Sequence, residues 1–518
     1  MRVDMVSIDS QFAEPFAQSI QALLANFAIV APNIMVSELV LDSRDVAVHK
    51  AFIAVKGHNR DGRDFIPQAI SLGAKVIIAQ CDSAELHGQV SMRENSLIIS
   101  FFELATKLSK LAAYFYHHPA NSLSVIAVTG TNGKTSVVQL SNQLAALLGE
   151  RSASIGTLGS GVYQGQTSQL NSTLNTTPDA ISIQRLLADF VGEGVYQVAL
   201  EASSHALVQD RLSALKTDVA VFTNLTRDHL DYHQTMDEYA QAKRILLTQP
   251  GLKALVLNAN DPEHKRWLAN TSSKTKVTLY GVNISTKTIA TDYQYCVANR
   301  VQFTATGVRF SLESSWGNCE LRLNLVGEFN VANVLAAISA QLCLGKSLKN
   351  IAYVAQKLRP VAGRMELFSH PQKATIVVDY AHTPDALEKS LIAARQHCKG
   401  QLWCVFGCGG DRDKGKRPLM GAIAERLADR VVITDDNVRT ETPQQIVEDI
   451  LQGCTNTKQI LVEHSRTQAI ELAAKQCKEQ DIILVAGKGH ENYQIIGQQS
   501  QAYDERAFVK QFQQGKVL

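Results

Sequence analysis

The sequence predicts an α/β protein in which a central parallel-sheet domain is flanked by an N-terminal α/β domain and a C-terminal Rossmann-like domain. Three observations support this prediction. First, 518 residues are too many for a single hydrophobic core. Second, short apolar runs alternate with helical patterns along most of the chain, which is typical of a parallel sheet. Third, several apolar runs end in glycine-rich or charged loops, where open α/β sheets bind their ligands.

Changes of pattern along the chain predict three domains, at residues 1–122, 123–357 and 358–518. In the first, the apolar runs "FIAV", "AKVIIAQ" and "NSLIISF" precede the helical pattern "FELATKLSKLAAYFY". The Pro and Asn of "HHPANS" mark a linker at 117–122. The second domain begins with "LSVIAVTGTNGKT", and around residues 285–325 its pattern changes to that of antiparallel strands. The third contains "KATIVVDYAH", "RVVITDDN" and "DIILVAGKGHE", each an apolar strand that opens into a loop.

The composition is that of a soluble globular protein, with 45% hydrophobic and 19% charged residues. Lys and Arg number 51 against 49 Asp and Glu, and no basic block stands out, so we expect no nucleic-acid partner. No apolar run approaches the roughly 18 residues that span a membrane. The first residues lack the apolar region of a signal peptide, and the nine cysteines lack a metal-binding spacing. These features predict a cytoplasmic protein with reduced thiols.

The segment "VIAVTGTNGKTS" predicts a phosphate-binding loop between a strand and a helix. Gly130 and Gly133 permit a tight turn, whose backbone N–H groups can cradle phosphate. Lys134 would reach the outer phosphates, and Thr135 would offer its hydroxyl to Mg²⁺. The usual loop has glycine six positions before the lysine, where this chain has Val128. The loop is therefore a variant, and a plain β–α turn is the alternative interpretation.

Polar side chains also follow two other apolar runs. "YQVALEASSHAL" places Glu201 at a strand end, and "DVAVFTNLTRDHLDYH" places Asn224, Asp228 and His229 just past another. Glu201 suits Mg²⁺, which prefers oxygen ligands, whereas His229 alone is better explained as a residue at a helix start. Lys243 lies in the helical pattern "YAQAKRILL", which by itself predicts a surface lysine.

A set of short segments spread over nearly the whole chain resembles the Mur ligase family. The segments are "LDSR", "GHNRDGRDFIPQA", "GTNGKT", "NTTP", "EASSHAL", "RDHLDYH", "GRME", "DYAHTPDALE", "GCGGDRDKGKRP" and "GKGHE". Within the family, they resemble the members that add the third residue of the peptidoglycan stem peptide. No single segment except the phosphate loop is decisive, but the ordered set is highly specific.

The resemblance implies a UDP-substrate-binding domain at 1–122, an ATP-binding domain at 123–357 and an amino-acid-binding domain at 358–518. It implies that ATP activates a carboxylate to an acyl phosphate, which an amine then attacks with release of phosphate. The implied cofactor is Mg²⁺, and the implied substrates are ATP, UDP-N-acetylmuramoyl dipeptide and meso-diaminopimelate. It further implies a cytoplasmic protein, and we expect a monomer.

The resemblance also implies a role for individual residues. ATP would contact Gly130, Thr131, Asn132, Gly133, Lys134, Thr135, Ser136, Asn260, Asp261 and Arg364. Mg²⁺ would be held by Thr135, Glu201 and His229, and the catalytic residues would be Lys134, His229 and Lys243. Lys243 matches a lysine that the family carbamylates, which would turn a cation into an anionic metal ligand. The UDP-linked substrate would contact Leu41, Ser43, His58, Asn175, Thr176, Thr177, Ser203, Gln209 and Arg211.

The incoming amino acid would, by the same resemblance, contact Arg412, Asp436, Asn437, Arg439, Gly487 and Glu491. Diaminopimelate has a carboxylate at its far end, with which Arg439 can pair, whereas lysine would leave that arginine unpaired and repelled. Family members that use diaminopimelate carry Asp-Asn-Pro-Arg where this chain has Asp-Asn-Val-Arg, so Val438 is a departure. Taken without the family, "GCGGDRDKGKRP" fits a flexible basic loop, because Arg412 replaces the last glycine of a dinucleotide fingerprint.

Three alternatives compete with a diaminopimelate-adding ligase. The nearest is its lysine-adding sister enzyme, which differs mainly in the amino-acid pocket. A folylpolyglutamate synthetase-like ligase is more remote, because it offers no reason for the "LDSR" domain. A P-loop NTPase that acts as a regulatory or binding module is the alternative from another class, and motifs for chemistry in all three domains argue against it.

Overall fold

The structure is a computed structural model that describes residues 17–57, 60–165, 170–171, 175–304, 307–457 and 460–515. Its contacts divide the chain into two compact units. The first consists of Met1–Gly130, Arg151–Ala220 and Arg227–Lys253, and the second of Thr131–Glu150, Val221–Thr226 and Ala254–Leu518. The three-domain boundaries expected from the sequence remain a prediction.

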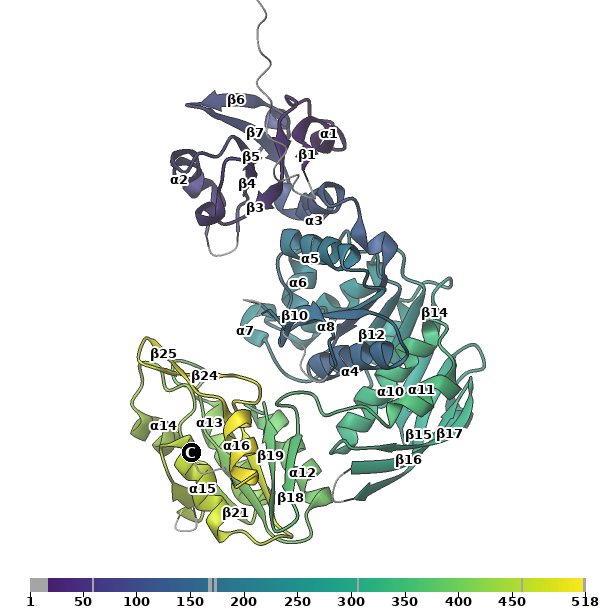
Figure 1. Cartoon of the computed structure of the whole chain (residues 1–518), viewed down its shortest axis with the longest axis vertical. Helices are drawn as coiled ribbons and strands as arrows, with labels where there is room; N and C mark the ends of the chain where they lie inside the picture. Colours follow the sequence, from purple (N-terminus) through teal and green to yellow (C-terminus); the bar gives the residue numbers. More distant parts are fainter. Residues whose placement is uncertain are drawn as a thin grey trace, which may run out of the picture. The chain divides into compact units, whose positions relative to one another are not determined.

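The N-terminal part of the first unit is a five-stranded sheet, drawn in purple and blue in Figure 1. Its strand order is β3 (Glu38–Val40), β4 (Lys50–Ala54), β5 (Val76–Cys81), β7 (Ser96–Phe102) and β6 (Val90–Arg93). The first four strands are parallel, and β6 pairs with β7 in the antiparallel sense. Side chains of β4 alternate between two buried clusters, because successive residues of a strand point to opposite faces. The strands expected from "FIAV", "AKVIIAQ" and "NSLIISF" are therefore confirmed.

Helices cover both faces of this sheet. They are α1 (Ile20–Ala25), α2 (Ile66–Ser71) and α3 (Leu104–Phe115). Helix α5 (Ala180–Gly192) packs on α3 and contributes Ala180, Ile181 and Ala188 to the same buried cluster. The exposed Arg185 of α5 also pairs with Glu38. This packing joins the N-terminal sheet to the start of α5, where polar residues gather.

The rest of the first unit presents the carboxyl ends of parallel strands. Strand β11 (Gln197–Glu201) lies between β8 (Ser124–Thr129) and β9 (Ser152–Gly156), and all three are parallel. Strand β10 (Gly159–Val162) pairs with β9 in the antiparallel sense. The polar residues that follow β11 open α6 (Ser204–Val208), and the later helices are α7 (Leu230–His233) and α8 (Met236–Arg244).

The first part of the second unit holds the helix that follows the phosphate loop. This helix, α4 (Lys134–Leu147), packs on α10 (Glu328–Cys343), and Gln341 Nε2 donates to the Ser141 carbonyl at 3.0 Å. Strands β13 (Ala254–Asn258), β14 (Lys276–Val282) and β15 (Gln294–Thr304) are parallel. Strands β16 (Gly307–Ser314) and β17 (Gly317–Leu323) continue from β15 with antiparallel pairing, which confirms the change of pattern predicted around residues 285–325.

The C-terminal part of the second unit is a six-stranded sheet with helices on both faces (Figure 1). The strand order is β18 (Glu366–His370), β19 (Lys373–Asp379), β23 (Ile482–Ala486), β20 (Leu402–Phe406), β21 (Arg430–Ile433) and β22 (Ile460–Val462). One face packs on α12 (Pro384–His397), α13 (Lys416–Leu427) and α14 (Pro443–Leu451). The other packs on α15 (Arg466–Gln476) and α16 (Glu505–Gln513). All pairs except β18–β19 are parallel, so the loops after β19, β20, β21 and β23 share one edge.

A short hairpin stands apart from this sheet. Strands β24 (Tyr493–Ile496) and β25 (Gln499–Ala502) pair in the antiparallel sense and follow the "GKGHE" segment. The hairpin did not figure among the elements expected from the sequence. It contacts the loop after β21 through a bridge between Arg439 and Ile496.

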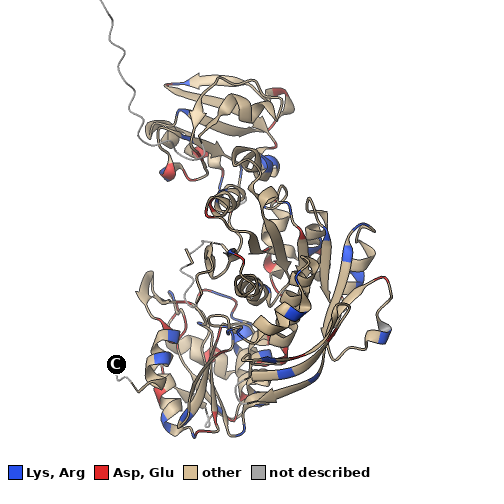
Figure 2. Ribbon diagram, turned by 45° about the vertical axis from the view of Figure 1, so that its right-hand side comes forward, with Lys and Arg blue, Asp and Glu red and all other residues tan. Residues whose placement is uncertain are grey.

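Charged residues of both signs are scattered over helices, strands and loops (Figure 2). All nine cysteines fall within the described ranges, and all nine are free thiols. Among the described segments, we find no helix with the length and apolarity needed to cross a membrane.

Candidate active site

The phosphate loop is closed by a glycine that no other residue can replace without strain. Gly133 caps α4 with a φ of +87°, in the left-handed region. This backbone conformation favours glycine, and a Cβ at this position would lie 2.5 Å from Asn333 Oδ1, which would have to move. The helix that follows begins at Lys134 and directs its N-terminal N–H groups toward the loop. The predicted strand–turn–helix geometry is confirmed.

The segment after β12 (Val219–Phe222) braces the phosphate loop within the second unit. Asn132 N donates to Asn224 Oδ1 at 3.0 Å, and Asn224 Nδ2 returns a bond of 3.0 Å to the Asn132 carbonyl. Thr131 Oγ1 donates to the Thr226 carbonyl at 3.1 Å and accepts from Thr226 N at 3.0 Å. Asn132 Nδ2 also reaches Asp385 Oδ2 of α12 at 3.2 Å. These bonds hold the loop in shape before any nucleotide binds.

Two lysines donate to carbonyls of this loop. Lys134 Nζ lies 2.8 Å from the Thr131 carbonyl, and Lys243 Nζ lies 2.9 Å from the Gly130 carbonyl. Lys243 is 1% exposed and its ammonium lies 4.1 Å from the centre of the Tyr239 ring. The helical pattern alone predicted a surface lysine, and that prediction is wrong, because the side chain of Lys243 is directed inward beside the loop.

Glu201 is a buried carboxylate at the end of β11. It is 1% exposed, and Thr157 donates to it twice, from N at 2.8 Å and from Oγ1 at 3.3 Å. A Cβ on Gly156 would lie 2.3 Å from Glu201 Oε1, so the strand beside it must carry glycine. Within the described residues, no Lys, Arg or His forms an ion pair with Glu201. A buried carboxylate without a protein cation suits a bound metal ion.

Five of the residues expected at the UDP-linked substrate form one hydrogen-bonded network in the first unit. Thr177 Oγ1 lies 2.7 Å from the Glu201 carbonyl and 3.1 Å from Ser203 Oγ. Thr176 Oγ1 lies 3.2 Å from Thr157 Oγ1, next to Glu201. Arg211 Nη1 donates to the Thr177 carbonyl at 2.7 Å, and Arg211 Nε donates to Gln209 Oε1 at 3.0 Å. Thr176, Thr177, Ser203, Gln209 and Arg211 are thus brought together beside Glu201.

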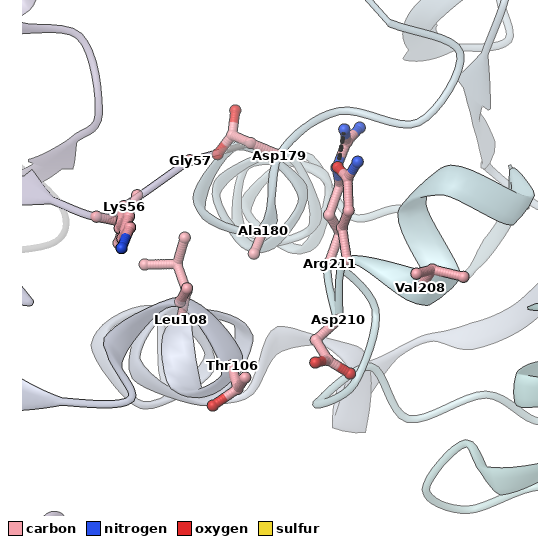
Figure 3. Close-up of a pocket in the computed structure, with 12 residues that line it drawn as sticks. Lys56, Gly57, Thr106, Leu108, Asp179, Ala180, Val208, Asp210 and Arg211 are labelled. Carbon is pink, nitrogen blue, oxygen red and sulfur yellow. Dashed lines mark hydrogen bonds between the residues drawn. The ribbon is translucent and has the colours of Figure 1, made fainter. Parts of the chain in front are cut away.

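A cavity of about 330 Å³ opens beside Arg211 and Gln209 (Figure 3). Its wall combines Lys56 and Gly57 from the loop after β4, Thr106 and Leu108 from α3, Asp179 and Ala180 from the start of α5, and residues 208–211 from the end of α6 and the turn that follows it. Burial lowers the pKa of Arg211 and raises that of Asp210. A cavity with partly desolvated charges and an apolar wall can bind a ligand that carries both anionic and apolar groups.

The other described residues expected at the UDP-linked substrate do not join this network. Ser43 Oγ donates to Gln68 Oε1 at 2.8 Å, and Leu41 packs against the N-terminal core. Asn175 is exposed. His58 lies outside the described residues, directly after Gly57 of the cavity wall. The structure thus shows local contacts for Leu41 and Ser43 but no link to the network around Glu201.

His229 stands at the start of α7, as its sequence context predicted. Its φ of +53° is in the left-handed region, and 45% of its side chain is exposed. The ring lies 5.1 Å from that of His205, which lies 4.2 Å from Tyr232. Burial and the neighbouring imidazoles lower the pKa of His205 to about 4, so that ring is neutral at pH 7.

Arg364 reaches the phosphate loop from the third predicted domain, within the second unit. Its Nη2 lies 3.5 Å from Thr135 Oγ1, and its guanidinium lies 4.4 Å from the centre of the Tyr380 ring. Its Nε is buried with no hydrogen-bond partner among the described residues. A stacked guanidinium with an unused donor beside the loop suits an anionic phosphate.

Asn260 and Asp261 have structural partners. Asn260 donates to and accepts from the backbone of Val282, at 3.0 and 2.8 Å. Asp261 accepts from Leu225 N at 2.8 Å and from Glu263 N at 2.9 Å. These bonds fix the loop after β13, and the contact with ATP expected from the resemblance remains a prediction. Ser136 is buried in the first turn of α4.

The amino-acid-binding residues expected from the resemblance converge at one edge of the C-terminal sheet. Asp436 and Asn437 are buried after β21, and Asn437 Nδ2 donates to Glu491 Oε2 at 3.1 Å. A Cβ on Gly487, whose φ is +119°, would lie 2.6 Å from Asp436 Oδ2. Four of the six residues are thus in direct or near contact. Arg412 is exposed in the loop after β20.

Arg439 is the fifth member of this cluster. Its φ is +51°, and the hairpin β24–β25 holds its backbone through Arg439 N to Ile495 O at 3.1 Å and Gly497 N to Arg439 O at 2.7 Å. Its Nη1 donates to the Gly410 carbonyl at 2.8 Å. The guanidinium therefore lies over the glycine-rich loop that also carries Arg412.

The structure shows why valine can occupy position 438, where related family members have proline. Its side chain is 4% exposed and belongs to the core cluster that α12, α13 and α14 share. Within the described part of the chain, its N–H donates no hydrogen bond. A position that needs an apolar side chain but no N–H accepts proline and valine alike.

Sequence reasoning missed several residues that the structure places in the site. Thr157 binds Glu201, Tyr380 stacks on Arg364, and Lys488 lies among the amino-acid-binding residues. Tyr380 and Lys488 stand inside the segments "DYAHTPDALE" and "GKGHE", so the motifs contained the signal. Thr157 lies in a strand-end stretch without any such pattern.

Three domain models of one family match successive parts of the chain. Residues 36–116 match the Mur ligase family catalytic domain, residues 128–341 the Mur ligase middle domain, and residues 363–489 the Mur ligase glutamate ligase domain. Together they cover most of the chain in the order in which the motifs occur.

Individual relatives agree with these matches. A protein of Haemophilus influenzae named UDP-N-acetylmuramoyl-L-alanyl-D-glutamate–2,6-diaminopimelate ligase is 43% identical over 489 residues, which is 94% of this chain and 98% of that protein. A solved structure with the same name has a TM-score of 0.69 at 33% identity and covers 96% of this chain and 99% of its own. The MurF ligase of Thermotoga maritima in complex with ADP shares the fold, with a TM-score of 0.61 at 20% identity over 87% of this chain and 93% of its own.

Proposed function

The chain belongs to the Mur ligase family, and from this premise we propose that it is the ATP-dependent ligase that joins meso-2,6-diaminopimelate to UDP-N-acetylmuramoyl-L-alanyl-D-glutamate. The observation that supports this most is the 43% identity to a protein of that name over 94% of the chain. The product would be a cytoplasmic precursor of peptidoglycan, made where ATP is available. The monomeric state remains a prediction.

The proposed reaction follows from the weakness of a carboxylate as an electrophile. The substrate carboxylate attacks the γ-phosphorus of ATP, which forms an acyl phosphate and releases ADP. The amine of the incoming amino acid then attacks the acyl carbon, and the tetrahedral intermediate expels inorganic phosphate as the amide forms. The first step brings two anionic groups together, and the second develops negative charge on the tetrahedral intermediate and the leaving phosphate, so fixed cations must offset these charges.

The described residues supply such cations near the phosphate loop. Lys134 begins α4 and folds back on the loop, and Arg364 places a stacked guanidinium 3.5 Å from Thr135 Oγ1. Arg364 also retains a buried Nε without a hydrogen-bond partner among the described residues. In the proposal, both side chains would bind the transferred phosphoryl group and stabilise its charge.

The donor groups also suit Mg²⁺. In the proposal, Thr135, Glu201 and His229 would hold the ion, and a carbamylated Lys243 would add an anionic ligand. Bound Mg²⁺ would neutralise charge on the phosphates. Glu201 supports this assignment because it is buried and, among the residues that the structure describes, its two oxygens accept only from Thr157. Lys243 supports it because its buried Nζ already lies beside the phosphate loop.

The network around Arg211 supports the assignment of the UDP-linked substrate. Arg211, Gln209 and the hydroxyls of Thr176, Thr177 and Ser203 would bind the anionic and amide groups of this substrate. The cavity beside Arg211 offers both charge and apolar surface to the same molecule. At the other substrate, Arg439 would pair with the far carboxylate of diaminopimelate, which lysine lacks.

The proposal is tested by phosphate release from the purified full chain. We expect release only when ATP, Mg²⁺, the UDP-linked dipeptide and meso-diaminopimelate are all present. Omission of the dipeptide controls for simple ATP hydrolysis. Release that depends on L-lysine alone would assign the chain to the sister activity, and release without any amino acid would refute the ligase assignment.

A further inference from the structure

A buried lysine lies at the centre of the amino-acid-binding residues without having been assigned a role. Lys488 Nζ donates to Glu491 Oε2 at 2.7 Å and to Asn437 Oδ1 at 2.9 Å. Asn437 Nδ2 also donates to Glu491 Oε2 at 3.1 Å, so the three side chains form a closed triangle of hydrogen bonds. The Lys488 side chain is 0% exposed.

Two acids share this single ammonium. Besides Glu491, Asp436 Oδ1 lies 3.8 Å from Lys488 Nζ, and the two carboxylate side chains are only 10% and 17% exposed. The centre of the Tyr493 ring lies 5.2 Å from the same ammonium. One buried and one partly buried carboxylate and a single ammonium sum to one formal negative charge. Water screens the interactions among these groups only weakly at this depth.

The triangle also fixes the loop that carries Arg439. Asn437 Oδ1, which binds Lys488, accepts a second bond of 2.9 Å from Ile495 N of the hairpin. Gln494 Nε2 donates to the Asp436 carbonyl at 2.9 Å. The Lys488 ammonium therefore holds the side chain of Asn437, which links the loop after β21 to the hairpin β24–β25.

From this geometry, and resting on the proposed function, we propose that Lys488 determines which amino acid the pocket accepts. It does so as a positioning residue that orients Asn437 and Glu491, and as a fixed charge that cancels one of two acids. The cluster then has room for one substrate ammonium, while Arg439 remains available for a carboxylate.

The two candidate amino acids differ in the charge that such a pocket meets. Diaminopimelate carries two ammonium and two carboxylate groups, whereas lysine carries two ammonium groups and one carboxylate. Loss of the Lys488 charge would leave Asp436 and Glu491 both uncompensated. The pocket would then attract an additional cation and would favour lysine relative to diaminopimelate.

The test compares the native chain with Lys488→Met, Lys488→Gln and Lys488→Arg. For each, kcat and KM are measured with meso-diaminopimelate, with L-lysine and with ATP. We expect Lys488→Met and Lys488→Gln to lower the ratio of kcat/KM for diaminopimelate over lysine by at least about tenfold, mainly through the KM for diaminopimelate. The KM for ATP should stay within about twofold, and Lys488→Arg, which keeps the charge, should retain most of the ratio.

The matched control is Lys373→Met. Lys373 also donates to backbone carbonyls in the C-terminal domain, those of Phe512 and Gln513, but it lies at the opposite end of β19 from the pocket edge. This variant should change neither the ratio of kcat/KM for diaminopimelate over lysine nor the KM for ATP. Thermal melting shows which variants fold. If Lys488→Met does not fold, the comparison is made with the less drastic Lys488→Gln.

Coupling is tested with the double variant Lys488→Met/Glu491→Gln. If Lys488 acts through Glu491, the double variant should bind diaminopimelate no worse than Glu491→Gln alone. An unchanged selectivity in a folded Lys488 variant, or equal increases in KM for diaminopimelate and ATP, would overturn the inference. A native chain that does not use diaminopimelate would instead overturn the proposed function.

Discussion

The Arg439 guanidinium donates a hydrogen bond of 2.8 Å to the carbonyl of Gly410. This bond joins the loop after β21 to the glycine-rich loop after β20. A Cβ on Gly409 would lie 3.1 Å from Arg439 Nη1, so small residues in that loop allow the guanidinium to lie over it. The arginine expected to select diaminopimelate is therefore already oriented by the backbone of a second strand-end loop.

Replacement of Arg439 by alanine should weaken binding of diaminopimelate specifically. Loss of a charge-assisted contact with a carboxylate typically costs a few kcal/mol, so we expect KM for diaminopimelate to rise about 30-fold or more. The KM for ATP should change little. Arg430→Ala, at the exposed start of β21, the strand that precedes this loop, is the control. Equal increases in both KM values would show that Arg439 does not bind the incoming amino acid specifically.

Replacement of Glu201 by glutamine should raise the Mg²⁺ concentration needed for activity. The amide removes the charge of a buried side chain while keeping an acceptor for Thr157 N, which lies 2.8 Å away. We expect the half-saturating Mg²⁺ concentration to rise at least about tenfold. Glu193→Gln, on the surface of the same unit, should leave it unchanged. An unaltered Mg²⁺ dependence in Glu201→Gln would remove this residue from the metal site.

Protonation of the buried His397 should lower the stability of the folded protein in mild acid. Its Nε2 accepts from Gly327 N at 3.2 Å while Nδ1 donates to the Thr304 carbonyl, so the folded state needs the neutral ring. Burial lowers the pKa of His397 below its ordinary value. The unfolded chain, with a histidine pKa of about 6.5, then binds more protons than the folded chain, and stability falls as pH drops through that value.

The melting temperature measures this effect. It should fall between pH 7 and pH 5 in the native chain, and His397→Asn should make that fall smaller, because one titrating group is gone. The exposed His49→Asn should leave the fall as it is. An identical pH dependence in His397→Asn and the native chain would show that His397 is not among the groups that cause it.

Because Arg466 and Glu505 form a buried ion pair, removing one partner should destabilise the protein more than replacing both. Both side chains are 0% exposed, and Arg466 Nε lies 2.6 Å from Glu505 Oε2. Arg466→Met leaves a buried carboxylate unpaired, which should reduce the free energy of unfolding by about 3–5 kcal/mol. Arg466→Met/Glu505→Leu should recover part of this loss in urea denaturation. A double variant less stable than the single one would contradict the account.

The residues near the phosphate loop show how far sequence reasoning reaches. Gly133, Lys134 and Thr135 were predictable because one short motif contains the strand, the turn and the helix start. The bracing by Asn224 and Thr226 was not predictable in detail, because it joins segments that are about ninety residues apart. Lys243 was misread from its helical pattern, since periodicity does not reveal which polar residue lies beside a distant loop.

The amino-acid pocket shows the same limit. The strand ends that carry Asn437, Gly487 and Glu491 were predictable, because the apolar runs of a parallel sheet place their loops at one edge. The hairpin β24–β25 was not, because its residues lack a strong alternation of apolar and polar side chains. Val438 could be judged only in the structure, which shows that its side chain is buried and that its N–H donates to no other described residue.

A competition between amino acids tests the central claim most directly. The full chain is supplied with ATP, Mg²⁺, the UDP-linked dipeptide and equal concentrations of meso-diaminopimelate and L-lysine, and the UDP-linked products are identified by mass spectrometry. The account predicts the tripeptide that ends in diaminopimelate as the dominant product. A dominant lysine-containing product would contradict it.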